Sequence, residues 1–386
     1  MDWKKNDVFQ VRIEDMSDTG EGIGKTDGFT WFVKDAVIGD VVEARVMKTK
    51  KSYGFARLMQ VLEPSACRVT PRCPSARQCG GCQLQAMSYE EQLKFKENKV
   101  RNNLSRIGGL TEIPMEPIIG MEEPWRYRNK AQFPFGKDKN GRIITGFYAG
   151  RTHAIIEQED CLLGVEENQP ILDCIRGFME EYHIAPYEEE THTGLLRHLY
   201  LRFSRTQVLC CLVVNSAKPL PGEEALVSAL RAAAPGLAGV AVSVNQERTN
   251  VVLGRELRSL WGHPWLDDTL CGLTFRISVP SFYQVNRDQA EVLYEQALAF
   301  AGLTGHELVL DLYCGIGTIS LVMARRAGKV IGAEIVPSAV TDAKANAARN
   351  GITNADFLCG DAGTAAQHLA MQGLRPDVIC VDPPRK

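Results

Sequence analysis

The spacing of apolar residues predicts a small β-barrel at the start of the chain. Within residues 1–60, short alternating runs such as 8–13 and 41–46 are separated by several glycines. Alternation with a period of two between glycine-containing turns is typical of short antiparallel strands. We therefore expect a barrel domain over residues 1–62.

The pattern changes twice more along the chain. Residues 66–88 are rich in cysteine, and the next stretch predicts an amphipathic helix from Tyr89 to about Ile107, ended by two glycines. From about 110 to 275 strand and helix signals are mixed, as in the strand-like runs 199–203 and 240–244. These features predict a central α+β domain over 63–275 that binds substrate.

After Pro280 the order becomes helix, strand, glycine turn, helix, and then strand and helix in alternation to a fourth strand. That order is typical of a parallel, doubly wound, Rossmann-like sheet. The predicted fold class is thus multidomain α/β, with this last domain spanning 276–386. Because only four strands are found, we expect the sheet to be incomplete.

Composition excludes some classes of protein. Of the 386 residues, 45% are hydrophobic and 24% charged, and no run of eighteen apolar residues occurs, so a membrane span is not expected. The polar start lacks the pattern of a secretory signal. We expect a cytoplasmic, monomeric protein whose twelve cysteines serve metal binding, catalysis or packing rather than disulfides.

A net charge of −3 means that affinity for nucleic acid must come from local basic patches. One candidate patch lies near the end of the predicted barrel. Its side chains suit phosphate contacts and base stacking, although a solvated hairpin edge explains them equally. The patch comprises Lys48, Lys50, Lys51, Tyr53, Phe55 and Arg57.

The cysteine-rich loop predicts a metal centre. Cys73, Cys79 and Cys82 have the spacing C-x5-C-x2-C, with two glycines between the second and third. Those glycines let thiolates and backbone amides turn toward an anionic cluster. Cys161 is the candidate fourth ligand, and Cys67 is an alternative. Zinc is the competing metal, but it favours paired knuckles, and one C-x2-C pair is present here.

The last domain carries the features of a nucleotide-type cofactor site. A buried strand at 307–314 runs into Gly315-Ile316-Gly317-Thr318, which lacks the full G-x-G-x-x-G of pyrophosphate binders. A second strand ends at Glu334, where a carboxylate can accept hydrogen bonds from ribose hydroxyls. Asp361 and Asp382 follow the third and fourth strands. For each acid, and for Asp361 above all, a helix N-cap is the alternative.

Together these segments resemble the RNA uracil-C5 methyltransferase family, in its iron-sulfur form with an N-terminal TRAM barrel. The resemblance spans the whole chain. It rests on the four cysteines 73, 79, 82 and 161 and on the motifs at 126–130 (RYRNK), 281–286 (SFYQVN), 311–317 (DLYCGIG) and 382–386 (DPPRK).

The resemblance implies the following roles. Cys73, Cys79, Cys82 and Cys161 would hold a [4Fe-4S] cluster. Arg128 and Phe282 would face the RNA, with the phenyl ring stacking a base turned out of its helix. The residues implied in binding S-adenosylmethionine are Gln284, Tyr313, Glu334 and Asp382, with Thr318 and Asp361 as weaker contacts.

The implied reaction adds a cysteine thiolate to uracil C6, which activates C5 for methylation, and a base then removes the C5 proton. In the family the cysteine lies in a Ser-Cys-Asn-Pro stretch and the base is a glutamate, both after the Asp-Pro-Pro segment. Neither occurs before Lys386, so we expect both beyond it and regard the chain as truncated. Cys314, Cys359 and Cys380 are expected beside buried strands and are not assigned this role.

The product that the resemblance implies is 5-methyluridine in 23S ribosomal RNA, with uridine 54 of transfer RNA or a non-catalytic RNA-binding fragment as alternatives. A radical methylthiotransferase would require C-x3-C-x2-C in the cysteine loop. An exocyclic-amine methyltransferase would prefer an aromatic residue where Arg385 follows the two prolines.

Overall fold

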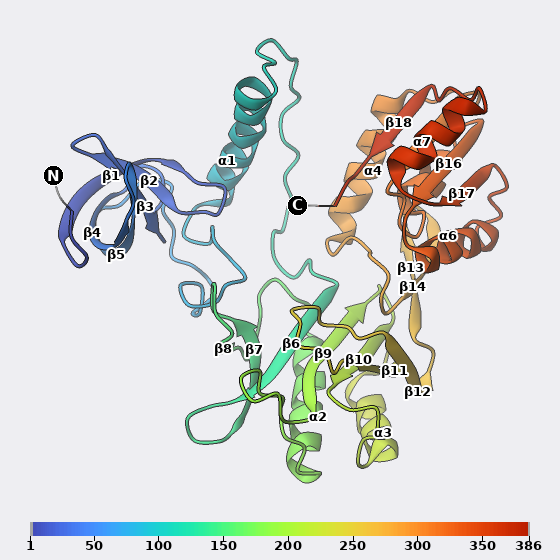
Figure 1. The fold of residues 1–386 in the computed structure, drawn as a ribbon, viewed down its shortest axis with the longest axis horizontal. Helices are drawn as coiled ribbons and strands as arrows, with labels where there is room; N and C mark the ends of the chain where they lie inside the picture. The colour runs from blue at the N-terminus through green and yellow to red at the C-terminus, as the bar shows by residue number, and fades with distance from the viewer. Residues whose placement is uncertain (1–2, 385–386) are drawn as a thin grey trace. The chain divides into compact units, whose positions relative to one another are not determined.

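The computed structural model describes residues 3–384, which form two compact units. The barrel unit runs up to Pro124 and includes Gly146–Gln158, and the sheet unit comprises Trp125–Thr145 and the chain from Glu159 onward. Figure 1 shows the elements of each unit. No helix among residues 3–384 has the length and apolar character needed to cross a bilayer.

The predicted barrel is confirmed. Five strands close in the order β1-β2-β3-β5-β4, with β3 and β5 parallel and the other pairs antiparallel. Its core surrounds the fully buried ring of Trp31, against which Gly54 packs so closely that a Cβ would lie 2.3 Å from the indole. Glycine is therefore required at this position. The strands are β1 (Val8–Met16), β2 (Gly22–Thr26), β3 (Phe29–Lys34), β4 (Val41–Thr49) and β5 (Tyr53–Glu63).

The predicted helix after the cysteine loop is present as α1 (Tyr89–Asn102), followed by a π-helical turn at Asn103–Ile107. Ser88 caps its start by accepting a hydrogen bond from the Glu91 N–H at 3.4 Å. None of its residues is buried. The sequence predicts that one apolar face of this helix is buried, but in the structure no face of α1 is buried.

The central part of the sheet unit is a mixed sheet. Neighbouring strands run in the order β12-β11-β10-β9-β6, followed by residues 143–145 of β7, and only β10 and β11 are parallel. The rest of β7 belongs to the barrel unit, where it pairs with β8. The elements are β6 (Lys130–Lys137), β7 (Ile143–Tyr148), β8 (Ile155–Glu157), α2 (Asn168–Glu181), β9 (Leu196–Phe203), β10 (Val208–Val214), α3 (Glu223–Ala233), β11 (Leu237–Val244) and β12 (Glu256–Gly262).

The C-terminal part is the predicted doubly wound sheet, with four parallel strands in the order β17-β16-β15-β18. One face packs Leu310 and Ile331 against Leu369 of α7, and the other packs Val309 and Val330 against α4, α5 and α6. Both faces are covered, as parallel sheets require. The elements are α4 (Arg287–Ala301), β15 (Leu308–Leu312), α5 (Thr318–Ala324), β16 (Lys329–Glu334), α6 (Pro337–Arg349), β17 (Ala355–Cys359), α7 (Ala362–Met371) and β18 (Val378–Val381).

A hairpin of β13 (Trp265–Leu270) and β14 (Leu273–Ser278) joins the two sheets. Its free edge is satisfied by amide side chains of α6. Asn350 accepts from the Thr274 N–H at 2.9 Å and donates to the Thr274 carbonyl at 2.8 Å, and Asn346 accepts from the Arg276 N–H at 2.8 Å. These bonds fix the hairpin on α6, directly before the 281–286 segment.

Candidate functional site

The turn after β15 forms the floor of the candidate site. Tyr313, Gly315 and Gly317 all have left-handed φ angles, of 72°, 56° and 82°. The strain at Tyr313, which a non-glycine residue rarely accepts, is held by the N–H groups of Tyr313 and Cys314, which donate to the Ala333 carbonyl at 2.9 and 3.0 Å. A Cβ at Gly315 would meet nothing within 4 Å. A ligand therefore has room to approach this backbone.

Glu334 lies against the same turn, at the end of β16. Its carboxylate accepts a hydrogen bond from the Gly315 N–H at 3.1 Å and another from the Val336 N–H at 2.8 Å. A carboxylate has about four acceptor positions, so two N–H groups fix its orientation and leave capacity for ligand hydroxyls. The sequence placed Glu334 at this strand end, and the structure brings it to the glycine turn.

Three carboxyl groups share the carboxyl edge of the sheet. Asp311 is fully buried in β15, and its pKa is raised to about 7. Burial is the main cause and the charges of Asp382 and Glu334 add to it, while a hydrogen bond from Ser320 opposes the rise. These effects show that Asp382 and Glu334 lie close enough to act on Asp311. The exposed side chain of Asp382 and that of Glu334 are therefore the acids available to a ligand.

The 281–286 segment is anchored by residues of the central sheet. Arg202 donates through Nη2 to the Ser281 carbonyl at 2.6 Å. Asn129 donates through Nδ2 to the Gln284 carbonyl and through its backbone N–H to the Val285 carbonyl, both at 2.9 Å. The central sheet thus holds the loop that carries the predicted cofactor and RNA contacts.

Adjacent side chains of this loop have opposite surroundings. Tyr283 is buried and donates to Asp268 at 3.1 Å, and Asp268 is also paired with Arg287 at 2.9 Å. Burial raises the Tyr283 pKa above its usual range. Phe282 is 67% exposed, and Gln284 is half-buried. An exposed phenyl ring next to a rigidly held residue is suited to stacking on a ligand.

Arg128 lies beside this loop. Its backbone forms an isolated antiparallel bridge with Asn286, and its N–H donates to the Leu163 carbonyl at 2.8 Å. The side chain is exposed. The structure therefore brings Arg128 and the loop of Phe282 together, as the predicted RNA-facing pair requires.

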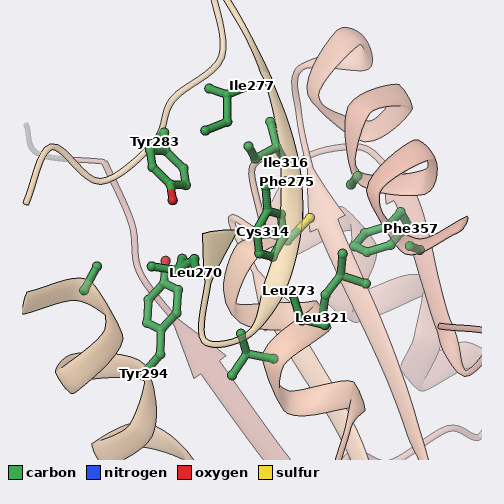
Figure 2. Packing of buried hydrophobic residues seen from close by; sticks show 14 of the residues in the cluster. Leu270, Leu273, Phe275, Ile277, Tyr283, Tyr294, Cys314, Ile316, Leu321 and Phe357 are labelled. Atoms are coloured by element: carbon green, nitrogen blue, oxygen red, sulfur yellow. The ribbon is translucent and has the colours of Figure 1, made fainter. Parts of the chain in front are cut away.

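Two predicted cofactor contacts are engaged in local structure. Thr318 begins α5, and its hydroxyl lies 2.9 Å from the phenol oxygen of the buried Tyr294; Figure 2 shows the Tyr294 ring in the core around the turn. Asp361 is the N-cap of α7 and accepts from the N–H groups of Gly363 and Thr364 at 2.9 and 3.2 Å. The alternative considered for Asp361 is thus realised, and its contact with a cofactor stays a prediction.

Ile335, which the sequence analysis did not single out, follows Glu334 directly and is 64% exposed. A large apolar side chain so exposed at the carboxyl edge of a parallel sheet is typical of a surface that a ligand covers. The signal in the sequence is the apolar residue directly after the acid that ends the second strand.

Two cysteines of this domain, Cys314 and Cys380, are not suited to nucleophilic attack. Cys314 lies among Phe275 and Ile316 in the core (Figure 2), and burial raises its pKa above the usual range. Burial also raises the Cys380 pKa, to about 12. Cys359 corrects the prediction, because it is exposed at the end of β17; the outward-facing position of that strand end could not be read from its apolar neighbours.

The cysteine loop lies in the barrel unit. Cys73, Cys79 and Cys82 are all partly exposed, and the Gly81 N–H lies 3.4 Å from the Cys79 sulfur. Within residues 3–384, no three His, Cys, Asp or Glu side chains are grouped as a metal site. Cys161 belongs to the sheet unit, where its carbonyl accepts from Arg126 at 3.2 Å. Cys67 packs in a small apolar cluster beside the barrel.

Comparison with known proteins agrees with this architecture. Residues 2–59 match the TRAM domain family, and residues 303–382 match a methyltransferase domain family. A protein of Halalkalibacterium halodurans named as an uncharacterized RNA methyltransferase is 46% identical, over 99% of this chain and 83% of its own length. One of Clostridium tetani with the same description is 43% identical over the same shares.

A solved structure shares the fold. The Pyrococcus abyssi tRNA (uracil-54, C5)-methyltransferase in complex with S-adenosyl-L-homocysteine superposes with a TM-score of 0.73 at 24% identity, covering 97% of this chain and 83% of that one. With the TRAM and methyltransferase domain matches and the close relatives, the chain belongs to the family of RNA methyltransferases that carry an N-terminal TRAM domain.

Proposed function

We propose that this protein transfers a methyl group from S-adenosylmethionine to C5 of a uridine in RNA. The observation that carries the proposal is the left-handed turn at Tyr313–Gly317 with the Glu334 carboxylate bound to its Gly315 N–H. This arrangement suits the ribose and methionine parts of the cofactor. The named activity of the Pyrococcus abyssi protein supports the choice of uracil C5.

Each site residue has a role that its surroundings support. Glu334 would accept the ribose hydroxyls, Tyr313 would pack on the cofactor, and Gln284 and Asp382 would satisfy its polar groups. Ile335 would cover the adenine. Thr318 and Asp361 would contribute weaker contacts.

On the RNA side, Phe282 would stack on the flipped uracil and Arg128 would contact the strand. The bound cofactor supplies an electrophilic methyl group, and uracil C5 becomes nucleophilic once a thiolate adds to C6. Because Cys314 and Cys380 are poor thiolates at neutral pH, neither is assigned that step. The residues named above would hold the cofactor and orient the base.

As substrate we propose 23S ribosomal RNA, as the resemblance implies, with transfer RNA as the alternative that the Pyrococcus abyssi protein's name favours. Labelled S-adenosylmethionine would be incubated with the protein and each transcript, and the digested RNA analysed for 5-methyluridine. Label in another nucleoside would contradict the C5 assignment, and label in transfer RNA alone would replace the substrate. We propose that the protein works as a monomer in the cytoplasm.

Cofactor binding has a test independent of turnover. Glu334→Gln removes the negative charge of the carboxylate that the Gly315 N–H holds in place. We expect S-adenosylhomocysteine to bind at least about 10-fold more weakly, because hydrogen bonds to charged groups contribute about 1.5–3 kcal/mol. Asp356→Asn on β17, an exposed acid paired with Lys329, is the matched control and should bind normally. Equal binding by both variants would rule out the Glu334 role.

The outer face of the barrel supports RNA binding as well. Phe32, Tyr53 and Phe55 lie side by side, with ring centroids 5.5–5.7 Å apart. Lys34 and Arg57 continue the same pair of strands in register. Aromatic rings beside cations form the usual platform for single-stranded nucleic acid. We propose that this face holds part of the RNA.

We also propose that Cys73, Cys79, Cys82 and Cys161 hold a [4Fe-4S] cluster. The Gly81 N–H directed at the Cys79 sulfur supports the proposal, because such bonds stabilise thiolate ligands. Anaerobically purified protein should contain about four iron atoms per chain and absorb near 400 nm, and Cys79→Ser should lose both. Zinc without iron in the purified protein would replace the cluster by the competing metal.

A further inference from the structure

Three cations gather where β6 meets β9. Lys130 and Arg202 lie directly opposite each other in the antiparallel ladder, and Arg128 precedes Lys130 by two residues. Across the described part of the chain, no Asp or Glu forms a salt bridge with any of the three. Within residues 3–384, the positive charge of this cluster therefore has no acidic ion-pair partner.

Arg202 is the buried member of the cluster, with 1% of its surface exposed. Its Nε donates to the Tyr200 hydroxyl at 2.9 Å and its Nη2 to the Tyr200 hydroxyl and the Ser281 carbonyl, while the buried Nη1 has no hydrogen-bond partner within residues 3–384. A guanidinium stays charged in proteins. Burying it among neutral acceptors costs several kcal/mol, which indicates that a counter-charge arrives with a ligand.

Lys130 faces the same cluster. Its Nζ lies 5.9 Å from the centre of the Tyr200 ring, over which the Arg202 guanidinium also lies. Burial lowers the Lys130 pKa, and the positive charges of Arg202 and Arg128 lower it further. The side chain is only half-buried and the Arg128 side chain is exposed, so a ligand can reach both.

The cluster lies at the base of the loop that carries Phe282. Arg202 binds the carbonyl of Ser281, and the backbone of Arg128 is bridged to Asn286. An anion bound by these cations would thus be adjacent to whatever stacks on Phe282.

We propose that Arg128, Lys130 and Arg202 form an oxyanion site for a backbone phosphate of the RNA, next to the nucleotide that stacks on Phe282. This inference rests on the proposed function. Arg128 and Lys130 contact the phosphate. Arg202 is a positioning residue, since it holds the Ser281 carbonyl and adds a fixed positive charge behind the two contacts.

The test uses a 12-nucleotide single-stranded RNA with one central uridine. Lys130→Gln should weaken binding about 10-fold and reduce the slope of log K against log salt by about 0.7, the loss of one phosphate contact on a single strand. Lys137→Gln, which removes an exposed lysine from the same strand, should change neither. Arg202→Met should reduce the slope of log K against log salt. Arg202→Lys should leave the slope unchanged, because lysine retains the positive charge.

A neutral methylphosphonate placed at each linkage in turn identifies the phosphate. At one linkage beside the uridine it should weaken binding by the unaltered protein and have no further effect on Lys130→Gln, because both changes remove the same contact. Additive effects at every linkage would overturn the site.

S-adenosylhomocysteine binding separates the two sources of an oxyanion. If Lys130→Gln weakens binding of this cofactor product and leaves RNA binding intact, the cluster holds the cofactor carboxylate and the phosphate proposal is wrong. If Lys130→Gln binds RNA as tightly as the unaltered protein, the proposed phosphate site is wrong and the proposed function is unaffected. If the unaltered protein does not bind RNA, the proposed function fails with it.

Discussion

Asp311 retains its proton up to about neutral pH, because it is buried next to two other acids. Its pKa in the folded protein is about 7, against about 3.9 for an unperturbed aspartate. Between these values the folded state binds more protons than the unfolded state, so the stability that this group contributes is full below about pH 4 and is lost as pH rises through 7.

Asp311→Asn should therefore flatten the pH dependence of stability. We expect the melting temperature of the unaltered protein to fall between pH 5 and pH 8 by several degrees more than that of the variant, since about 1 kcal/mol corresponds to 2–4 °C in a domain of this size. Thermal unfolding followed by circular dichroism at the two pH values measures this difference. Parallel curves for the two proteins would show that Asp311 does not titrate in this range.

The place of a single site residue could be predicted where a sequence motif fixes both the element that carries it and the edge of the sheet at which it lies. Glu334 ends a strand, and parallel strands bring such ends to one edge, so its place at the turn follows from the sequence. Arg202 gives no comparable signal, because an arginine within an alternating strand reads as a solvent-facing residue. Its burial depends on a loop that comes 79 residues later in the chain, where the Ser281 carbonyl accepts its hydrogen bond.

At the scale of elements, the RNA-binding face that we propose on the barrel lies on β3 and β5. Tyr53→Ala should weaken binding of a single-stranded RNA at least about 5-fold, because stacking contributes about 1–3 kcal/mol per base. Tyr53→Phe keeps the ring and should bind normally. Leu62→Ala, at the exposed end of β5, controls for loss of apolar surface. Fluorescence anisotropy measures all four proteins, and equal affinities would exclude the face.

Element type was easier to predict than element pairing. The period-two runs predicted the barrel strands, and the alternation of strands and helices predicted the doubly wound sheet. The parallel pairing of β3 with β5 was not foreseen, because register depends on which faces close around Trp31. The helix α1 shows the reverse case, since its sequence pattern is helical and yet no residue of it is buried.

At the scale of the whole molecule, the barrel core and the methyltransferase core are composed of different residues. The barrel core is built around Trp31 and the methyltransferase core around the turn after β15. A ligand that binds only the folded site stabilises the region it contacts by RT ln(1 + [L]/Kd), about 2.7 kcal/mol at 100 times Kd. The effect of the cofactor on stability should therefore be confined to one unit.

Hydrogen exchange with and without S-adenosylhomocysteine tests this. We expect slower exchange at 313–317, at 334–336 and in the 281–286 loop, by up to about 100-fold for 2.7 kcal/mol. Amides of β1–β5 should exchange at unchanged rates, and Glu334→Gln should reduce the protection at least about 10-fold at the same ligand concentration. Protection of the barrel strands would contradict independent cores. Protection absent from 281–286 but present at 313–317 would remove Gln284 from the cofactor site and leave that loop to the RNA alone.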